Sequence, residues 1–72
     1  MGIYIIQVEP KNGTLRAREA ERKIRDVTNY TSIAYKSGSL EISLILDNPR
    51  QAMQEVHRLN KETDYTFKLM YQ

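Results

Sequence analysis

The chain has 72 residues, of which 40% are hydrophobic and 28% are charged, a balance typical of a small globular domain rather than a disordered chain. Eleven basic and nine acidic side chains leave a formal net charge of +2, which is too small to indicate a surface built for polyanions. There is no cysteine, which excludes disulfides, thiolate nucleophiles and cysteine metal sites.

The first predicted element is a strand over residues 3–8, IYIIQV, which is rich in β-branched and aromatic side chains. Strict alternation would point Gln7 into the core, so we expect a β-bulge there that turns Val8 inward. In that arrangement Tyr4 and Ile6 point to the opposite, open face of the sheet. The strand is expected to stop at a group of turn-forming residues, Pro10, Asn12 and Gly13.

A helix is predicted next, from Thr14 as its N-cap to about residue 28. Its buried stripe is formed by apolar residues at helical spacing, Ala17, Ala20, Ile24 and Val27. Two acid-first pairs four residues apart are expected on its outer side, Glu19 with Lys23 and Glu21 with Arg25. Three arginines share the side roughly opposite the stripe, Arg18, Arg22 and Arg25. They form either a phosphate-contacting ridge or, as we favour, a solvated helix surface.

Residues 31–36 and 39–46 are predicted to form a β-hairpin around the two-residue turn Ser37-Gly38. The expected cross-strand pairs are Tyr35 with Leu40, Ala34 with Glu41, Ile33 with Ile42, Ser32 with Ser43, and Thr31 with Leu44. A shift by one residue would place apolar side chains of one strand opposite polar side chains of the other. The turn and the alternation therefore agree on one register.

Asn48 and Pro49 predict the start of a second helix, with Asn48 as the N-cap and Pro49 at the first helical position. We expect this helix to end near Asn60. Its buried stripe is Ala52, Val56 and Leu59. A last strand is predicted from about Tyr65 to Tyr71.

The predicted order is βαββαβ in one domain that spans residues 1–72. Right-handed connections and a single buried sheet face make this an α+β, ferredoxin-like sandwich. It consists of a four-stranded antiparallel sheet of order 4-1-3-2 with two helices on one face. The other face of the sheet is left open.

The chain resembles the RNA-recognition-motif family over nearly its whole length. IYIIQV is similar to the first-strand motif of that family, DNPRQAMQEVHRLN to its second helix, and DYTFKLMY to its last strand. The resemblance implies that Tyr4 would stack on a base. The third strand, however, lacks the family's basic and aromatic motif and carries Ser39, Glu41 and Ser43 at those places. The energy of two stacking platforms, about 1–3 kcal/mol per base, is therefore absent.

The sequence contains no motif that indicates a catalytic or cofactor site. There is no glycine-rich phosphate loop, no nucleophile beside a base and no pair of inward carboxylates, so we expect no enzyme activity. The single histidine, His57, has no partner at the spacing of metal ligands, and neither a metal nor another cofactor is expected.

The favoured interpretation is a small interaction or inhibitor protein that binds a protein partner, or a second copy of itself, through its open sheet face or an edge strand. An artificial stable scaffold without any ligand would carry the same locally consistent pattern. The expected contact patch is Tyr4, Ile45 and Met70, and no membrane partner is expected. The lack of cysteine, of a signal peptide and of a membrane-spanning run favours the cytoplasm for a natural chain.

The alternative is a degenerate RNA-recognition module that binds single-stranded nucleic acid weakly. Its expected contacts are Tyr4, Lys36, Lys68, Arg18, Arg22 and Arg25.

Overall fold

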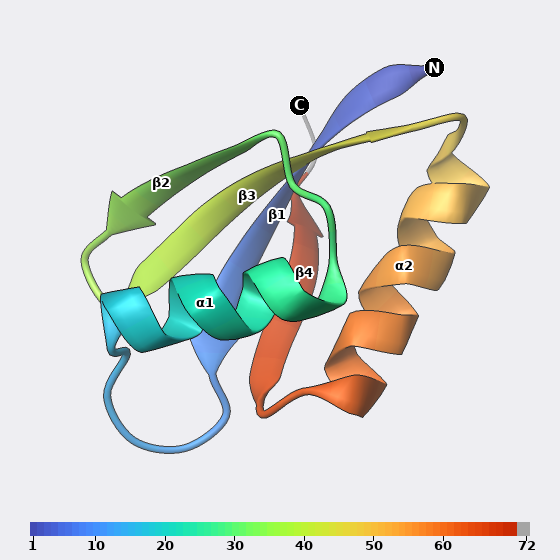
Figure 1. The fold of residues 1–72 in the computed structure, drawn as a ribbon. Coiled ribbons are helices and arrows are strands. Elements are labelled where there is room, and N and C mark those ends of the chain that lie inside the picture. Colours follow the sequence, from blue (N-terminus) through green and yellow to red (C-terminus); the bar gives the residue numbers. More distant parts are fainter. Residues whose placement is uncertain (71–72) are drawn as a thin grey trace.

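The computed structural model describes residues 1–70 and contains six elements in the order β1, α1, β2, β3, α2, β4 (Figure 1). The strands are β1 (Gly2–Pro10), β2 (Ser32–Lys36), β3 (Ser39–Leu46) and β4 (Tyr65–Met70), and the helices are α1 (Ala17–Val27) and α2 (Pro49–Glu62). All strand pairs are antiparallel, and the sheet order is β2-β3-β1-β4. This is the predicted order read from the other side, so the α+β class and the βαββαβ arrangement are confirmed. The predicted end of the last strand, Tyr71, lies outside the described residues.

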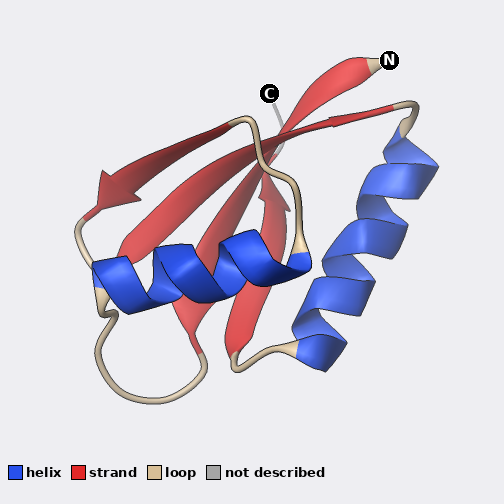
Figure 2. Ribbon diagram, viewed as in Figure 1, coloured by secondary structure: helices blue, strands red, loops and turns tan. Residues whose placement is uncertain are grey.

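The core lies between one face of the sheet and the two helices, which cover that same face (Figure 2). Its members from the strands are Ile6, Val8, Leu40, Ile42, Leu44, Tyr65 and Phe67, and its members from the helices are Ala20, Ile24, Val56 and Leu59. The strand residues among them recur with a period of two, as a sheet with one buried face requires.

β1 is a regular strand, and this corrects two expectations about it. Every residue from Gly2 to Val8 has one partner on β3, so the predicted bulge at Gln7 is wrong. Ile6 and Val8 are fully buried, which places Ile6 in the core instead of on the open face. Gln7 and Glu9 lie on the side of the strand opposite Ile6 and Val8, and the side chain of Gln7 donates a hydrogen bond to Glu9 at 3.3 Å. Gln7 therefore points to the open face.

α1 (Ala17–Val27) begins two residues later than a Thr14 cap would place it. Arg16 occupies the N-cap position and its side chain makes no capping bond, so the predicted cap at Thr14 is wrong. Leu15 lies nine residues before Ile24, which is half a turn out of phase in an α-helix, and a helix through Leu15 would therefore expose it. Because the chain stays non-helical up to Arg16, Leu15 packs against the core, while Ala17 is exposed instead of joining the buried stripe.

The start of α2 follows the sequence prediction closely. Pro49 opens the helix, and the Oδ1 atom of Asn48 accepts a hydrogen bond from the Gln51 amide at 2.9 Å. The helix extends two residues beyond Asn60, the predicted end, to Glu62. One carbonyl of its last turn is bonded from the β1–α1 segment, because Lys11 Nζ donates to the Asn60 oxygen at 2.7 Å.

Arg58 ties the two helices together. Its guanidinium donates to the carbonyl oxygen of Val27, the last residue of α1, at 2.7 Å. The same group pairs with Glu55 at 2.6 Å and Glu62 at 3.2 Å on its own helix. On α1, the two predicted ion pairs form, Glu19 with Lys23 at 3.0 Å and Glu21 with Arg25 at 3.6 Å.

The β2–β3 hairpin has the predicted register. The four predicted pairs from Ser32 with Ser43 to Tyr35 with Leu40 form, whereas the predicted pair of Thr31 with Leu44 does not, because β2 begins at Ser32. Gly38, at the second position of the turn, has a φ of +79°, a conformation that favours glycine over residues with a side chain.

Replacing Gly38 with alanine should lower the free energy of unfolding by about 1–2 kcal/mol, because an L-residue is strained at that φ. Nothing lies within 4 Å of the added Cβ, so steric crowding does not contribute. Gly2→Ala is the matched control, since its Cβ would meet the Tyr4 ring at an ordinary 3.7 Å. Urea unfolding of both variants measures the difference, and equal losses would contradict the assignment to backbone strain.

Candidate functional site

The uncovered face of the sheet presents its side chains in rows fixed by the strand register. One row contains Ser32, Ser43, Ile5 and Met70, taken across β2, β3, β1 and β4. The next row contains Ala34, Glu41, Gln7 and Lys68. Ile45 and Ile3 are paired beyond the first row, toward the start of β1. One end of the face is therefore apolar and the adjoining row is charged or polar.

We define the apolar patch as Ile3, Ile5, Ile45 and Met70. Ile3 is 61% exposed, Ile45 48% and Met70 37%, while Ile5 between them is half-buried. Ile5 lies beside Met70 in the pairing of β1 with β4, and Ile3 beside Ile45 in the pairing of β1 with β3. The four side chains thus form one connected hydrophobic area, with no helix over it.

Tyr4 is not part of this patch, and its expected place on the open face is wrong. It has the same parity as Ile6 and is paired with the buried Leu44 on β3. A Cβ on Gly2 would lie 3.7 Å from the Tyr4 ring, so the ring folds along its own strand over Gly2. Tyr4 therefore lies on the helix side of the sheet, half-buried, and is absent from the surface where a base platform would be required.

The other proposed nucleic-acid contacts are divided between the two sides of the molecule. Lys36 and Lys68 lie on the open face, and Lys36 is 3.9 Å from Glu41 on the neighbouring strand. Arg18, Arg22 and Arg25 are exposed on α1, which covers the opposite face. Arg25 also donates to the Tyr30 hydroxyl at 3.2 Å. The structure does not bring these six residues together.

The two edges of the sheet differ. At β4, the side chain of Asn60 donates to the Phe67 carbonyl at 3.0 Å and accepts from the Phe67 amide. The Tyr65 amide donates to the Thr63 hydroxyl at 3.2 Å. Because these groups point away from β1, the outer edge of β4 is paired by side chains over Tyr65–Phe67, the half of the strand next to the end of α2.

The edge at β2 has no such cover among residues 1–70. β2 is only five residues long, which limits the number of backbone groups that it exposes. Tyr35 lies on this strand and is half-exposed, and its hydroxyl donates to Glu21 of α1 at 2.9 Å. That hydrogen bond raises the pKa of Tyr35. β2 is therefore the accessible edge of the sheet.

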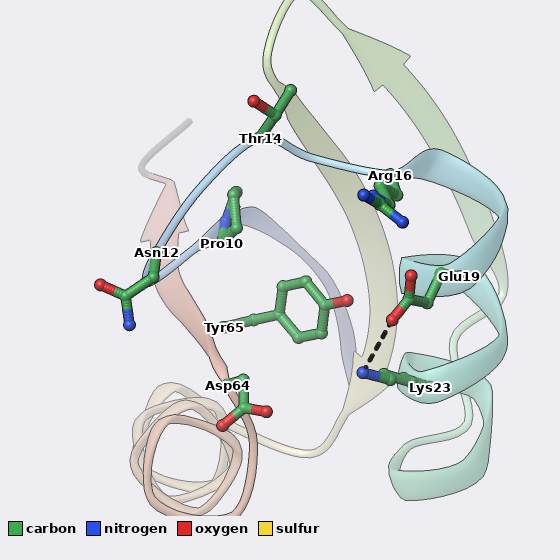
Figure 3. Close-up of a pocket in the computed structure, with 8 residues that line it drawn as sticks. All are labelled: Pro10, Asn12, Thr14, Arg16, Glu19, Lys23, Asp64 and Tyr65. Atoms are coloured by element: carbon green, nitrogen blue, oxygen red, sulfur yellow. Dashed lines mark ion pairs between the residues drawn. The ribbon is translucent and has the colours of Figure 1, made fainter.

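An open hollow of about 450 Å³ lies on the helix side, between the segment that joins β1 to α1, the α1 helix and the start of β4 (Figure 3). Its lining residues are Pro10, Asn12, Thr14, Arg16, Glu19, Lys23, Asp64 and Tyr65. The Tyr65 ring extends across it, with the hydroxyl toward the ion pair between Glu19 and Lys23. Its two basic and two acidic side chains balance, so the lining selects neither an anion nor a cation by net charge.

The titration of the hollow's ion pair does not suit proton transfer near neutral pH. The hydrogen bond and the charge of Lys23 lower the pKa of Glu19, and those of Glu19 raise the pKa of Lys23. Each shift moves the group further from pH 7, whereas a general acid or base works best with a pKa near the operating pH. This pair is therefore suited to holding α1 together rather than to acid–base chemistry.

Ile3 and Ile5 lie on the open face although the sequence pattern was not interpreted in that way. A signal for them was present: Gln7 and Glu9 are polar, and Val8 between them is apolar. Continuing the strand to Pro10 would have assigned the odd positions to the open face and the even positions to the core.

Within residues 1–70, no group of three or more histidine or acidic side chains is placed to hold a metal ion. Neither described helix has the length and apolar character needed to cross a membrane. The comparisons with known proteins add no relative: no family model matches the chain, and neither a curated protein nor a solved structure shows significant similarity to it.

Proposed function

We propose that this protein is a non-catalytic interaction module that binds another protein chain through the apolar patch on its open sheet face. The observation that carries the proposal is the clustering of Ile3, Ile5, Ile45 and Met70 at one end of an uncovered face. A connected hydrophobic area rimmed by polar side chains is typical of a surface that loses water on binding a protein.

The element order and the strand order support a place for this fold among the ferredoxin-like sandwiches. They also support the likeness to the RNA-recognition motif in framework. The open face differs from what that likeness implies, because Tyr4 lies on the other side of the sheet. Of the six expected nucleic-acid contacts, only Lys36 and Lys68 lie on the open face.

An apolar partner surface accounts for the patch better than a nucleic acid does. No aromatic side chain from the described residues lies on the open face, and Glu41 in its central row would repel phosphate. Three exposed aliphatic side chains have no role in phosphate or base recognition. They are the side chains that would be buried against a protein.

The proposal is tested by NMR of the protein with labelled isoleucine and methionine methyl groups. Spectra are recorded over a concentration series, with a soluble protein extract, and with mixed-sequence single-stranded RNA. We expect the patch methyls of Ile3, Ile5, Ile45 and Met70 to broaden with the protein itself or with the extract. Met53, which is 52% exposed on α2, serves as the internal reference.

The double variant Ile3→Ser plus Ile45→Ser should abolish this broadening. Burial of one isoleucine contributes about 1.5–3 kcal/mol, so losing two weakens binding by more than about tenfold. Met53→Ser is the matched control: it removes the Met53 signal and should leave the broadening of the patch methyls as in the unmodified chain. Shifts seen only with RNA, near Lys36 and Lys68 and sensitive to salt, would replace the proposal with the nucleic-acid alternative. Unchanged patch methyls in all three series would indicate a scaffold without a ligand.

A further inference from the structure

The open face carries opposite charges on either side of β1, one of the two inner strands of the sheet. Glu41 on β3 and Lys68 on β4 are both paired with Gln7 of β1, one on each side. Neighbouring strands are about 4.8 Å apart, so the two charges lie at matching positions left and right of β1. Within residues 1–70, Lys68 has no ion pair, and Glu41 has only the 3.9 Å contact with Lys36.

This arrangement is complementary to itself. Consider two copies stacked face to face, related by a two-fold axis that runs along β1 between the sheets. The axis lays β3 of one copy over β4 of the other, so Glu41 of each copy faces Lys68 of the second copy. A single symmetry operation therefore creates two opposite-charge contacts, as an isologous interface requires.

The same axis brings the β1 part of the apolar patch onto itself. Ile3 and Ile5 lie on β1 and would meet their own counterparts, Met70 would face the smaller Ser43 on β3, and Ile45 lies outside these contacts. The Gln7 amide, also on the axis, carries both a donor and an acceptor and can pair with its equivalent. Glu9 also lies on β1, so the Glu9 carboxylates of the two copies face each other, at the exposed rim where water screens their repulsion.

The overlap of the two faces is that of a small interface. The axis along β1 stacks three strands, β3, β1 and β4, and leaves β2 outside, so at about 4.8 Å per strand the overlap is about 14 by 30 Å. A standard interface buries about 800 Å² on each partner, so this contact is below that size. Association is therefore expected to depend on protein concentration.

We propose that the occupant of the apolar patch is a second copy of this chain, held by the patch and by two symmetric Glu41–Lys68 pairs. This inference rests on the proposed function and adds the identity of the partner. The partner must carry complementary charges at the positions of Glu41 and Lys68 as well as an apolar surface. A surface that bound proteins in general would not need that charge arrangement.

Sedimentation velocity over a concentration series tests the dimer directly. The mass of the unmodified chain should rise from 8.5 kDa toward twice that value. Lys68→Glu places like charges opposite each other at both contacts, and so does Glu41→Lys. Each single variant should weaken dimerisation by roughly tenfold or more. Arg18→Glu on α1 makes the same change in net charge as Lys68→Glu, away from the face, and it should leave the dimer intact.

Two further samples, a double variant and a mixture of the single variants, distinguish the symmetric pairing from a general effect of charge. The double variant Glu41→Lys plus Lys68→Glu exchanges the two charges and should restore the dimer. An equimolar mixture of the two single variants should also form a dimer, because the carboxylates of one variant then face the ammonium groups of the other. Loss of association in both samples would overturn the two-fold arrangement along β1.

The outcomes distinguish the further inference from the proposed function. A chain that remains monomeric at every concentration, but whose patch methyls broaden with the protein extract, would refute the second copy as partner and retain the protein-binding proposal. A monomer with unperturbed patch methyls under both conditions would refute both.

Discussion

Replacing Leu59 with alanine is expected to lower the free energy of unfolding by about 2–5 kcal/mol. Leu59 is fully buried on α2 and belongs to the core that joins both helices to the sheet. Deleting its branched end removes buried apolar area and leaves a cavity that the rest of a small core can only partly fill. A domain of this size has about 4–10 kcal/mol of stability in total, so this single change removes a large share of it.

Urea unfolding followed by circular dichroism measures this loss at one fixed protein concentration, since any association shifts the apparent stability. Met53→Ala on the same helix is the control, because Met53 is 52% exposed and its truncation should cost less than about 0.5 kcal/mol. A loss below about 1 kcal/mol for Leu59→Ala would mean that α2 does not pack on the sheet as described.

Replacing Asn60 with alanine is the second change with a large expected effect. The Asn60 amide satisfies both the N–H and the C=O of Phe67, and Phe67 is 98% buried. Leaving buried polar groups without partners costs about 1–3 kcal/mol, so a loss in that range is expected. The same change exposes the outer backbone groups of β4, and it should promote association at concentrations where the unmodified chain is monodisperse.

Two measurements on Asn60→Ala check these effects separately: urea unfolding for the stability and light scattering for the mass. Asn29→Ala is the matched control, since Asn29 is exposed in the segment between α1 and β2. It should change the free energy of unfolding by less than about 0.5 kcal/mol. If both asparagines gave the same small change, the bonds between Asn60 and Phe67 would not contribute as described.

The parts of the fold that the sequence predicted well are those where two local signals agree. The β2–β3 register follows from the Ser37-Gly38 turn together with the alternation of its strands. The start of α2 follows from Asn48 and Pro49, each of which favours its observed position independently. In both cases the local structure is determined by residues within about ten positions of each other in the sequence.

Errors arose where the local pattern was ambiguous or where tertiary packing decides. In β1, apolar side chains occupy both parities from Ile3 to Ile6, so the pattern there cannot say which face is buried. In the segment before α1, the hydroxyl of Thr14 favours an early cap, but the burial of Leu15 requires a later start. A contact with the core outweighed a capping preference there.

The candidate site was predicted in part for the same reasons. Ile45 and Met70 lie on the open face as expected, since the hairpin and the last strand alternate cleanly. The prediction placed the even-numbered residues of β1 on the open face, whereas the odd-numbered residues lie there. Tyr4 was therefore included in the patch, and Ile3 and Ile5 were left out. The cover on β4 was not predicted at all, because it depends on how the end of α2 is docked beside the sheet and not on any sequence pattern.

The paired edge of β4 limits what this protein can build from folded molecules. A sheet grows into a fibre only if each added molecule offers a new free strand at its far side. Here a second molecule that joined at β2 would present its own β4 outward, with the Tyr65 and Phe67 backbone already bonded to Thr63 and Asn60. Strand addition over this half of β4 therefore ends after one step, which disfavours growth of native chains into a fibre.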